Sequence, residues 1–212
     1  MAHGAPGVVG VLARFVEAGV ERARSRRLLE AAVAPLLRAP APGRSPRDAG
    51  RREGAPLRPG WCHGAAGVAG VLLRAGRALG RADVEAAAMR MLRDLPDGAA
   101  SEPRVPGAAR EPRVLDASFC HGAAGLAHVC NAAFQLTGAP ELRQRAVRWL
   151  AALLQMRRPG AGIGGYCAPR LDGSAARWAD DPTLLSGAVG VALVLRAAVE
   201  DRVPAWQRLF LL

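Results

Sequence analysis

The chain has 212 residues, of which half are apolar and only 4% aromatic, and its formal net charge is +11. This length fits one soluble domain with a substantial core, and the abundance of Ala and Leu predicts an all-α fold. The basic residues are all Arg, spread along the chain without an aromatic platform, so the charge does not indicate a nucleic-acid partner, although an acidic peptide partner stays open.

A short glycine motif recurs four times and divides the chain into units. An apolar run follows each copy, and a period of roughly sixty residues suits one pair of helices and a long loop per unit. We therefore predict four inner helices that are apolar on nearly every side. Their lead glycines are Gly4, Gly64, Gly122 and Gly187, and the first three helices are expected to stop at Gly19, Gly80 and Gly138.

Each inner helix is followed by a segment that carries charge on one face, which predicts an outer helix. These segments are 21–38, 83–94, 141–157 and, shorter, 204–212. The stretches between units, 39–60, 96–117 and 158–182, are rich in Pro, Gly and Arg and are predicted to be long loops. Ordered loops of this length often help to build a site, and the first two end at a repeated hexapeptide. We expect them to rim it.

The expected cellular compartment is inferred from three features: membrane spans, a signal peptide and disulfide bonds. Its longest apolar stretches, 64–73 and 184–199, are short or broken by Gly and Arg, so we predict no membrane span. No charged segment followed by an apolar core opens the chain, as a signal peptide would require. Four Cys residues are too few for a dense disulfide framework. We therefore expect a cytoplasmic protein with reduced thiols.

The repeated hexapeptide Cys-His-Gly-Ala-Ala-Gly, at 62–67 and 120–125, supplies soft metal ligands in duplicate. Close helix packing would explain its glycines, and core packing would explain an isolated Cys or His, but neither explains Cys-His twice in register. If equivalent positions of adjacent units share one end of neighbouring helices, the two thiols converge where helix dipoles stabilise thiolates. Zinc takes thiolate and imidazole, and three ligands leave a position open whereas four close the site. The candidates are Cys62, Cys120, His121 and His63.

The remaining Cys and His residues fit structural positions better. Cys130 and His128 fall inside the apolar helix of the third unit, and we expect both in the core. Cys167 ends a Gly-rich stretch and is interpreted as a non-ligand. No phosphate-binding loop has the strand context that it would need.

The motifs Trp61-Cys62-His63-Gly64-Ala65-Ala66-Gly67 and Phe119-Cys120-His121-Gly122 resemble the lanthionine synthetase C-like family, the lanthipeptide cyclases. The glycine motifs at 3–7 and 184–193 extend the resemblance over nearly the whole chain, which corresponds to about the C-terminal half of a family member. The resemblance implies a partial α/α toroid with about four of seven pairs of inner and outer helices. We therefore expect residues 1–212 to form a single domain of this family, truncated at its N-terminus.

The resemblance also implies a chemistry. It assigns Zn²⁺ to Cys62, Cys120 and His121, with the fourth position open to a thiol of a dehydrated precursor peptide. Family members add such a thiolate to dehydroalanine or dehydrobutyrine and close a thioether ring. Zinc would lower the pKa of the thiol and orient its sulfur.

Three further residues match active-site positions of the family. His3 matches a histidine assigned to acid/base work, Arg58 an arginine that could stabilise enolate charge, and Trp61 the neighbouring tryptophan. The family's catalytic Asp belongs to the absent half, so the catalytic set is incomplete, and His63 stands where an aromatic residue is common. The alternatives are a non-catalytic zinc-binding scaffold for a modified peptide or a companion enzyme such as a dehydratase, and a helical remnant with a structural metal.

Overall fold

The structure is a computed structural model, and it describes residues 4–38, 59–97, 116–172, 175–200 and 202–212. Most of the first two predicted loops lies outside these ranges. His3 and Arg58 also lie outside the described residues. The described part is mostly helical, as predicted, with two short strands.

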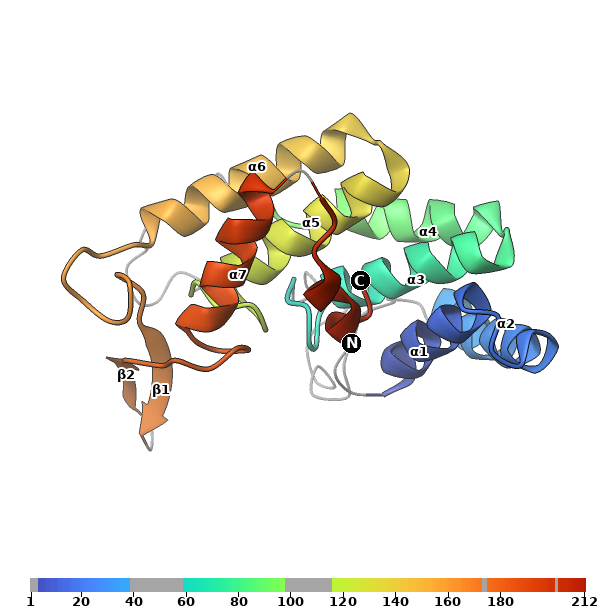
Figure 1. The fold of residues 1–212 in the computed structure, drawn as a ribbon, viewed down its shortest axis with the longest axis horizontal. Coiled ribbons are helices and arrows are strands. Elements are labelled where there is room, and N and C mark those ends of the chain that lie inside the picture. The colour runs from blue at the N-terminus through green and yellow to red at the C-terminus, as the bar shows by residue number, and fades with distance from the viewer. Residues whose placement is uncertain (1–3, 39–58, 98–115, 173–174, 201) are drawn as a thin grey trace.

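The helices form an arc in which inner and outer helices alternate along the chain (Figure 1). The first three inner helices each pack against the outer helix that follows, and α1 packs on α3, α3 on α5, and α5 on α7. This arrangement confirms the predicted partial toroid. The inner helices are α1 (Ala5–Glu17), α3 (Ala65–Leu79), α5 (Ala123–Thr137) and α7 (Ala188–Val199), and the outer helices are α2 (Arg22–Arg38), α4 (Ala82–Arg93) and α6 (Pro140–Gln155).

Apolar patterning and glycine caps explain where these helices form. Nearly every residue of α3 is buried, whereas α4 buries only one face, which is the expected difference between inner and outer helices. Gly80 and Gly138 end α3 and α5 in the left-handed conformation, with φ of 69° and 71°. None of the described helices combines the length and the apolarity needed to cross a membrane.

The prediction of an outer helix over 204–212 is wrong. This segment forms a short 3-10 helix, η2 (Ala205–Phe210), and it lies in the middle of the arc (Figure 1). Gly10 of α1 and Gly70 of α3 leave room for it, because a Cβ on either would lie 2.8 Å from a side-chain carbon of Leu211 or Leu212. The apolar end of the chain therefore fills the interior instead of covering the outside.

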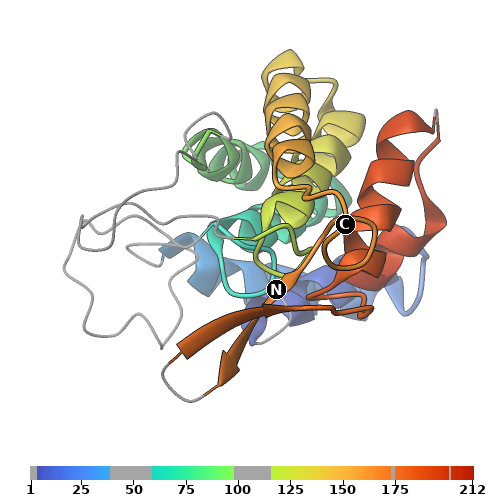
Figure 2. The same cartoon turned by 90° about the vertical axis from the view of Figure 1, so that its left-hand side faces the viewer.

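The predicted loop 158–182 contains a hairpin that the sequence reading did not anticipate. Strands β1 (Ala168–Asp172) and β2 (Ala175–Ala179) pair antiparallel, with Ala168 opposite Ala179. An ion pair of 3.3 Å between Arg170 and Asp181 ties the hairpin to the segment that leads into α7. Figure 2 shows the hairpin projecting from the helical body.

The first inner helix differs from the second in what covers it. Val8, Val11 and Phe15 form a stripe along α1 that is 41–55% exposed. The residues at the same repeat positions of α3, the helix on which α1 packs, are buried, at no more than 5% exposed. Those residues are Val68, Val71 and Ala75.

Candidate metal centre

The last two inner helices begin with glycines that are required by the preceding loop. A Cβ on Gly125 would lie 1.9 Å from the carbonyl oxygen of Phe119, and one on Gly190 would lie 2.1 Å from that of Leu184. No side chain fits at such distances. Each loop can therefore fold tightly over the first turn of its own helix only because Gly125 or Gly190 occupies that position. At these two positions the close approach is made by the loop backbone and not by a neighbouring helix.

Hydrogen bonds between successive loops bring the two motif cysteines together. The backbone N–H of Cys62 donates to the carbonyl of Cys120 at 3.1 Å, and that of Cys120 donates to the carbonyl of Leu185 at 2.9 Å. Leu185 holds the repeat position of the two cysteines in the fourth unit. The same backbone contact therefore joins the loops of the second, third and fourth units and places the residues of this repeat position side by side.

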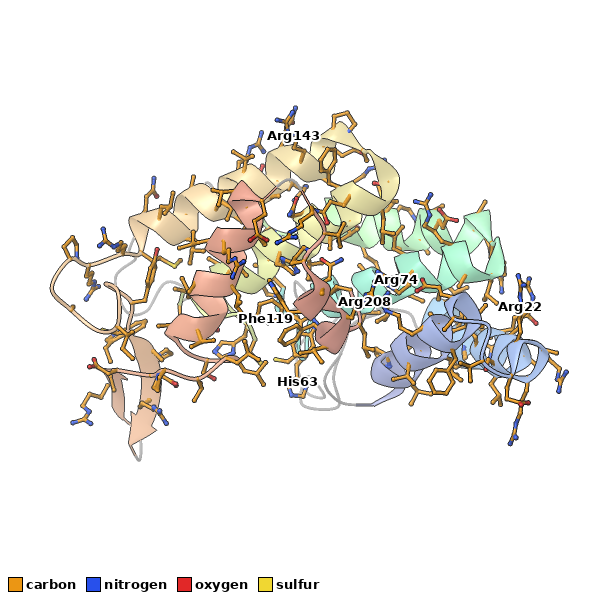
Figure 3. The ribbon with its side chains drawn as sticks, viewed as in Figure 1. Arg22, His63, Arg74, Phe119, Arg143 and Arg208 are labelled. Atoms are coloured by element: carbon orange, nitrogen blue, oxygen red, sulfur yellow. The ribbon has the colours of Figure 1, made fainter. Side chains whose placement is uncertain are left out.

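The two thiols meet a histidine. The Sγ atoms of Cys62 and Cys120 and one ring nitrogen of His121 all lie within 4.8 Å of one another. In the described ranges these three side chains form the group that could hold a metal ion, and His63 is not part of it. His63 is half-buried and lies at the lower margin of the helical body, below Phe119 (Figure 3).

The two thiols share a hydrogen bond that shifts their pKa values in opposite directions. The hydrogen bond with Cys120, together with that from the His121 imidazole, holds the pKa of the Cys62 thiol far below its usual value. The same hydrogen bond, together with burial, raises the pKa of the Cys120 thiol above its usual value. The pair thus shares one proton, and ionising both sulfurs requires a further positive charge between them.

Asp116 is a site residue that the sequence reading missed. Its Oδ2 accepts a hydrogen bond from Nε2 of His121 at 2.9 Å, and its side chain is only 3% exposed. This hydrogen bond, followed by the contact with Cys62, raises the pKa of His121 to about 10. The available signal was a repeat, because Asp116 and Asp181 each stand six residues before a lead glycine.

Trp61 joins the site to the C-terminal segment. Its indole N–H donates to the carbonyl of Phe210 at 3.2 Å, and its ring lies 5.6 Å from that of Phe119 and 5.2 Å from that of Phe210. The side chain is buried directly before Cys62. Trp61 therefore anchors the loop of the second unit against the interior.

The residues interpreted as structural lie in the core, as predicted. Cys130 is fully buried, and His128 is 1% exposed and stacks on Trp206 with ring centroids 4.4 Å apart. Burial lowers the pKa of His128 to about 4, and the Gln207 side chain only partly offsets this effect. Cys167 is half-buried and lies outside the group that could hold a metal ion.

The donor set fits zinc. Two sulfurs and one imidazole are ligands that zinc prefers, and two Zn–S bonds of about 2.3 Å would hold the sulfurs within about 4.6 Å. The observed limit of 4.8 Å requires little adjustment. Three protein ligands leave a fourth position for another molecule, which is the pattern of catalytic zinc sites.

Comparisons with known proteins agree with this fold. The structure is similar to that of nisin cyclase, with a TM-score of 0.65 and 18% sequence identity, over 99% of this chain and 48% of that one. The chain thus spans about half the length of nisin cyclase. No curated protein sequence matches it. The family model described as lanthionine synthetase C-like protein matches residues 1–211, and the chain therefore belongs to this family.

Proposed function

We propose that the protein binds Zn²⁺ through Cys62, Cys120 and His121 and acts as a lanthipeptide cyclase-type protein. Its substrate is a dehydrated precursor peptide whose Cys thiolates add to dehydroalanine or dehydrobutyrine and form thioether rings. The observation that carries this proposal is the convergence of the three side chains within 4.8 Å, from loops of two successive units. The family and the nisin cyclase likeness support the same chemistry.

The side chains of the chain itself divide the work. Cys62 and Cys120 supply the two thiolates, and His121, which donates a hydrogen bond to Asp116, supplies the imidazole. Bound zinc would lower the pKa of an incoming peptide thiol and orient its sulfur. As the sulfur–carbon bond forms at the β-carbon, the double bond of the dehydro residue becomes an enolate, whose α-carbon then takes up a proton.

Three residues are proposed to serve the reacting groups. His3 is assigned to the proton transfer and Arg58 to stabilising the enolate, by their match to the family's motif. Trp61 is assigned to the wall of the site, and its position directly before Cys62 supports this. The family's catalytic Asp has no counterpart in the 212 residues, so turnover is proposed to need a further polypeptide segment.

We also propose an alternative function, a non-catalytic scaffold, since the likeness to nisin cyclase covers only 48% of that chain. In this version the zinc centre grips a modified peptide or a companion enzyme, such as a dehydratase, without turning it over. Both versions require the same metal centre and differ only in catalysis.

One set of measurements tests these proposals. Metal analysis with X-ray absorption is expected to show one zinc with two sulfur ligands, one protein nitrogen and an exchangeable fourth ligand. Zinc-loaded protein is then incubated with a dehydrated precursor peptide, and thiol alkylation with mass spectrometry counts the rings. Rings support the cyclase, whereas zinc and peptide binding without rings support the scaffold. A closed four-ligand shell would contradict both and indicate a structural metal.

A further inference from the structure

We propose that Asp116 is a positioning residue that holds the His121 imidazole in the tautomer and orientation in which Nδ1 faces the two thiols. The inference rests on the proposed zinc site and adds a residue outside its ligand set. Asp116 does not touch the reacting groups in this assignment. It acts through His121.

Packing does not hold the His121 ring in place, because its side chain is 51% exposed. The contact that orients it is the hydrogen bond of 2.9 Å from Nε2 to Oδ2 of the buried Asp116. A carboxylate only accepts hydrogen bonds, so Nε2 must carry the hydrogen. In a neutral imidazole the other nitrogen, Nδ1, then keeps its lone pair, and that lone pair is available to a metal ion.

The carboxylate is itself held rigidly. Its Oδ1 accepts a hydrogen bond from the backbone N–H of Ser118 at 2.7 Å, and the Asp116 carbonyl accepts one from the N–H of Ala123 at 3.0 Å. Asp116 is therefore fixed both to its own loop and to the first residue of α5. Its remaining oxygen presents a stationary acceptor to the ring.

The fourth unit contains the same turn without the ligands. Oδ1 of Asp181 accepts a hydrogen bond from the N–H of Thr183 at 2.7 Å, and its carbonyl accepts one from Ala188 at 2.8 Å. Its Oδ2 pairs with Arg170 instead of a histidine. Building the turn is thus common to both Asp residues, and only Asp116 has the additional contact with a metal-ligand candidate.

The substitution Asp116→Asn separates the two roles. The Asn side-chain oxygen can still accept from Ser118, but its amide nitrogen can only donate to Nε2, which would move the ring hydrogen to Nδ1. Competition with a chromophoric chelator is expected to show zinc affinity about 10- to 100-fold weaker than in the unsubstituted protein. The matched control, Asp181→Asn, removes the charge from the equivalent turn of the fourth unit. It is expected to leave zinc affinity within about twofold of that of the unsubstituted protein, because Asp181 does not contact a proposed ligand.

The unsubstituted protein is measured first. If it binds no zinc, the proposed function fails together with this inference. If it binds zinc and Asp116→Asn binds equally well, or if Asp181→Asn weakens binding to the same degree, only the positioning role is overturned. Nitrogen-15 NMR of the zinc-loaded, unsubstituted protein gives a readout that is independent of variant folding. It is expected to show His121 with hydrogen on Nε2 and metal on Nδ1, and the reverse assignment would overturn the proposal.

Discussion

The loops before α5 and α7 are built alike but carry different chemistry. In each, an Asp caps its own loop, and a carbonyl lies so close to the helix that only glycine fits, at Gly125 and Gly190. The scaffold of the motif is therefore independent of metal ligands. Glycine and Asp build the turn, and the two residues before the lead glycine decide whether it carries candidate metal ligands.

Those two residues are Cys120 and His121 in the third unit and Leu185 and Ser186 in the fourth. The backbone at Leu185 still accepts the hydrogen bond from Cys120, so the fourth loop supports the site without supplying a ligand. A repeat protein can thus bring candidate metal ligands together at one joint between units and continue the same backbone contact at the next joint without them.

The largest expected effect is a loss of zinc binding when a side chain is removed from the loop before α5 but not from the loop before α7. Cys120→Ala removes a proposed ligand and is expected to weaken zinc binding by more than about 100-fold, beyond what loss of an outer-shell partner costs. Leu185→Ala, at the same repeat position, is expected to keep full zinc content, because the hydrogen bond from Cys120 goes to its backbone carbonyl, which the substitution retains. Metal analysis after dialysis checks both. Equal loss of zinc in the two variants would show that the fourth loop shapes the site through its side chain.

Because the two loops share the same backbone contact, substitution of Gly125 or of Gly190 is expected to lower the free energy of unfolding by a similar amount. Gly125→Ala and Gly190→Ala each bring a Cβ within about 2 Å of a loop carbonyl, so the loop must move. We expect each to lower the free energy of unfolding by about 1–3 kcal/mol or more. Urea denaturation followed by circular dichroism measures the loss. A tolerated Gly190→Ala would mean that the two loops are not held by the same contact.

A further pair of repeat positions tests which inner-helix faces are covered. Val71→Ala removes two methyl groups from a fully buried position of α3 and is expected to cost about 2 kcal/mol of unfolding free energy. Val11→Ala, its counterpart on α1, is 41% exposed and is expected to cost less than about 0.5 kcal/mol. Chemical denaturation compares the two. A cost at Val11 equal to that at Val71 would mean that another polypeptide covers α1 in solution.

The last comparison concerns pH and the repeat position that is held by His128 in α5 and Leu193 in α7. Burial lowers the pKa of His128 from 6.5 to about 4, so below pH 6.5 the unfolded chain binds more protons than the folded one. Stability from the neutral ring is complete above pH 6.5 and is lost on acidification, by up to about 1.4 kcal/mol per pH unit.

His128→Phe keeps an aromatic ring against Trp206 without a titrating group. The variant is expected to lose less stability than the unsubstituted protein between pH 7 and pH 5, which denaturation at the two pH values measures. Parallel losses in the two proteins would show that His128 contributes nothing to acid sensitivity.

Some of the site could be predicted from the sequence because the same hexapeptide occurs at 62–67 and at 120–125. The hexapeptides gave four candidate ligands, and the family resemblance selected three of them, Cys62, Cys120 and His121. The structure brings these three side chains together. Asp116 could not be assigned from its spacing, because a single Asp at the end of a long loop is ordinary until its carboxylate is seen beside His121. Its repetition at Asp181 indicates a turn but not the second contact.

Sequence periodicity by itself determined the order of inner and outer helices, since apolar patterning and glycine caps act over a few residues. Tertiary structure decided where the end of the chain goes. The residues of 204–212 are as apolar as an outer helix requires, but the space left by Gly10 and Gly70 is filled by Leu211 and Leu212. The space between α1 and α3 is formed by residues of two helices that are far apart in the sequence. Only the packing of the whole arc therefore determines which segment fills it.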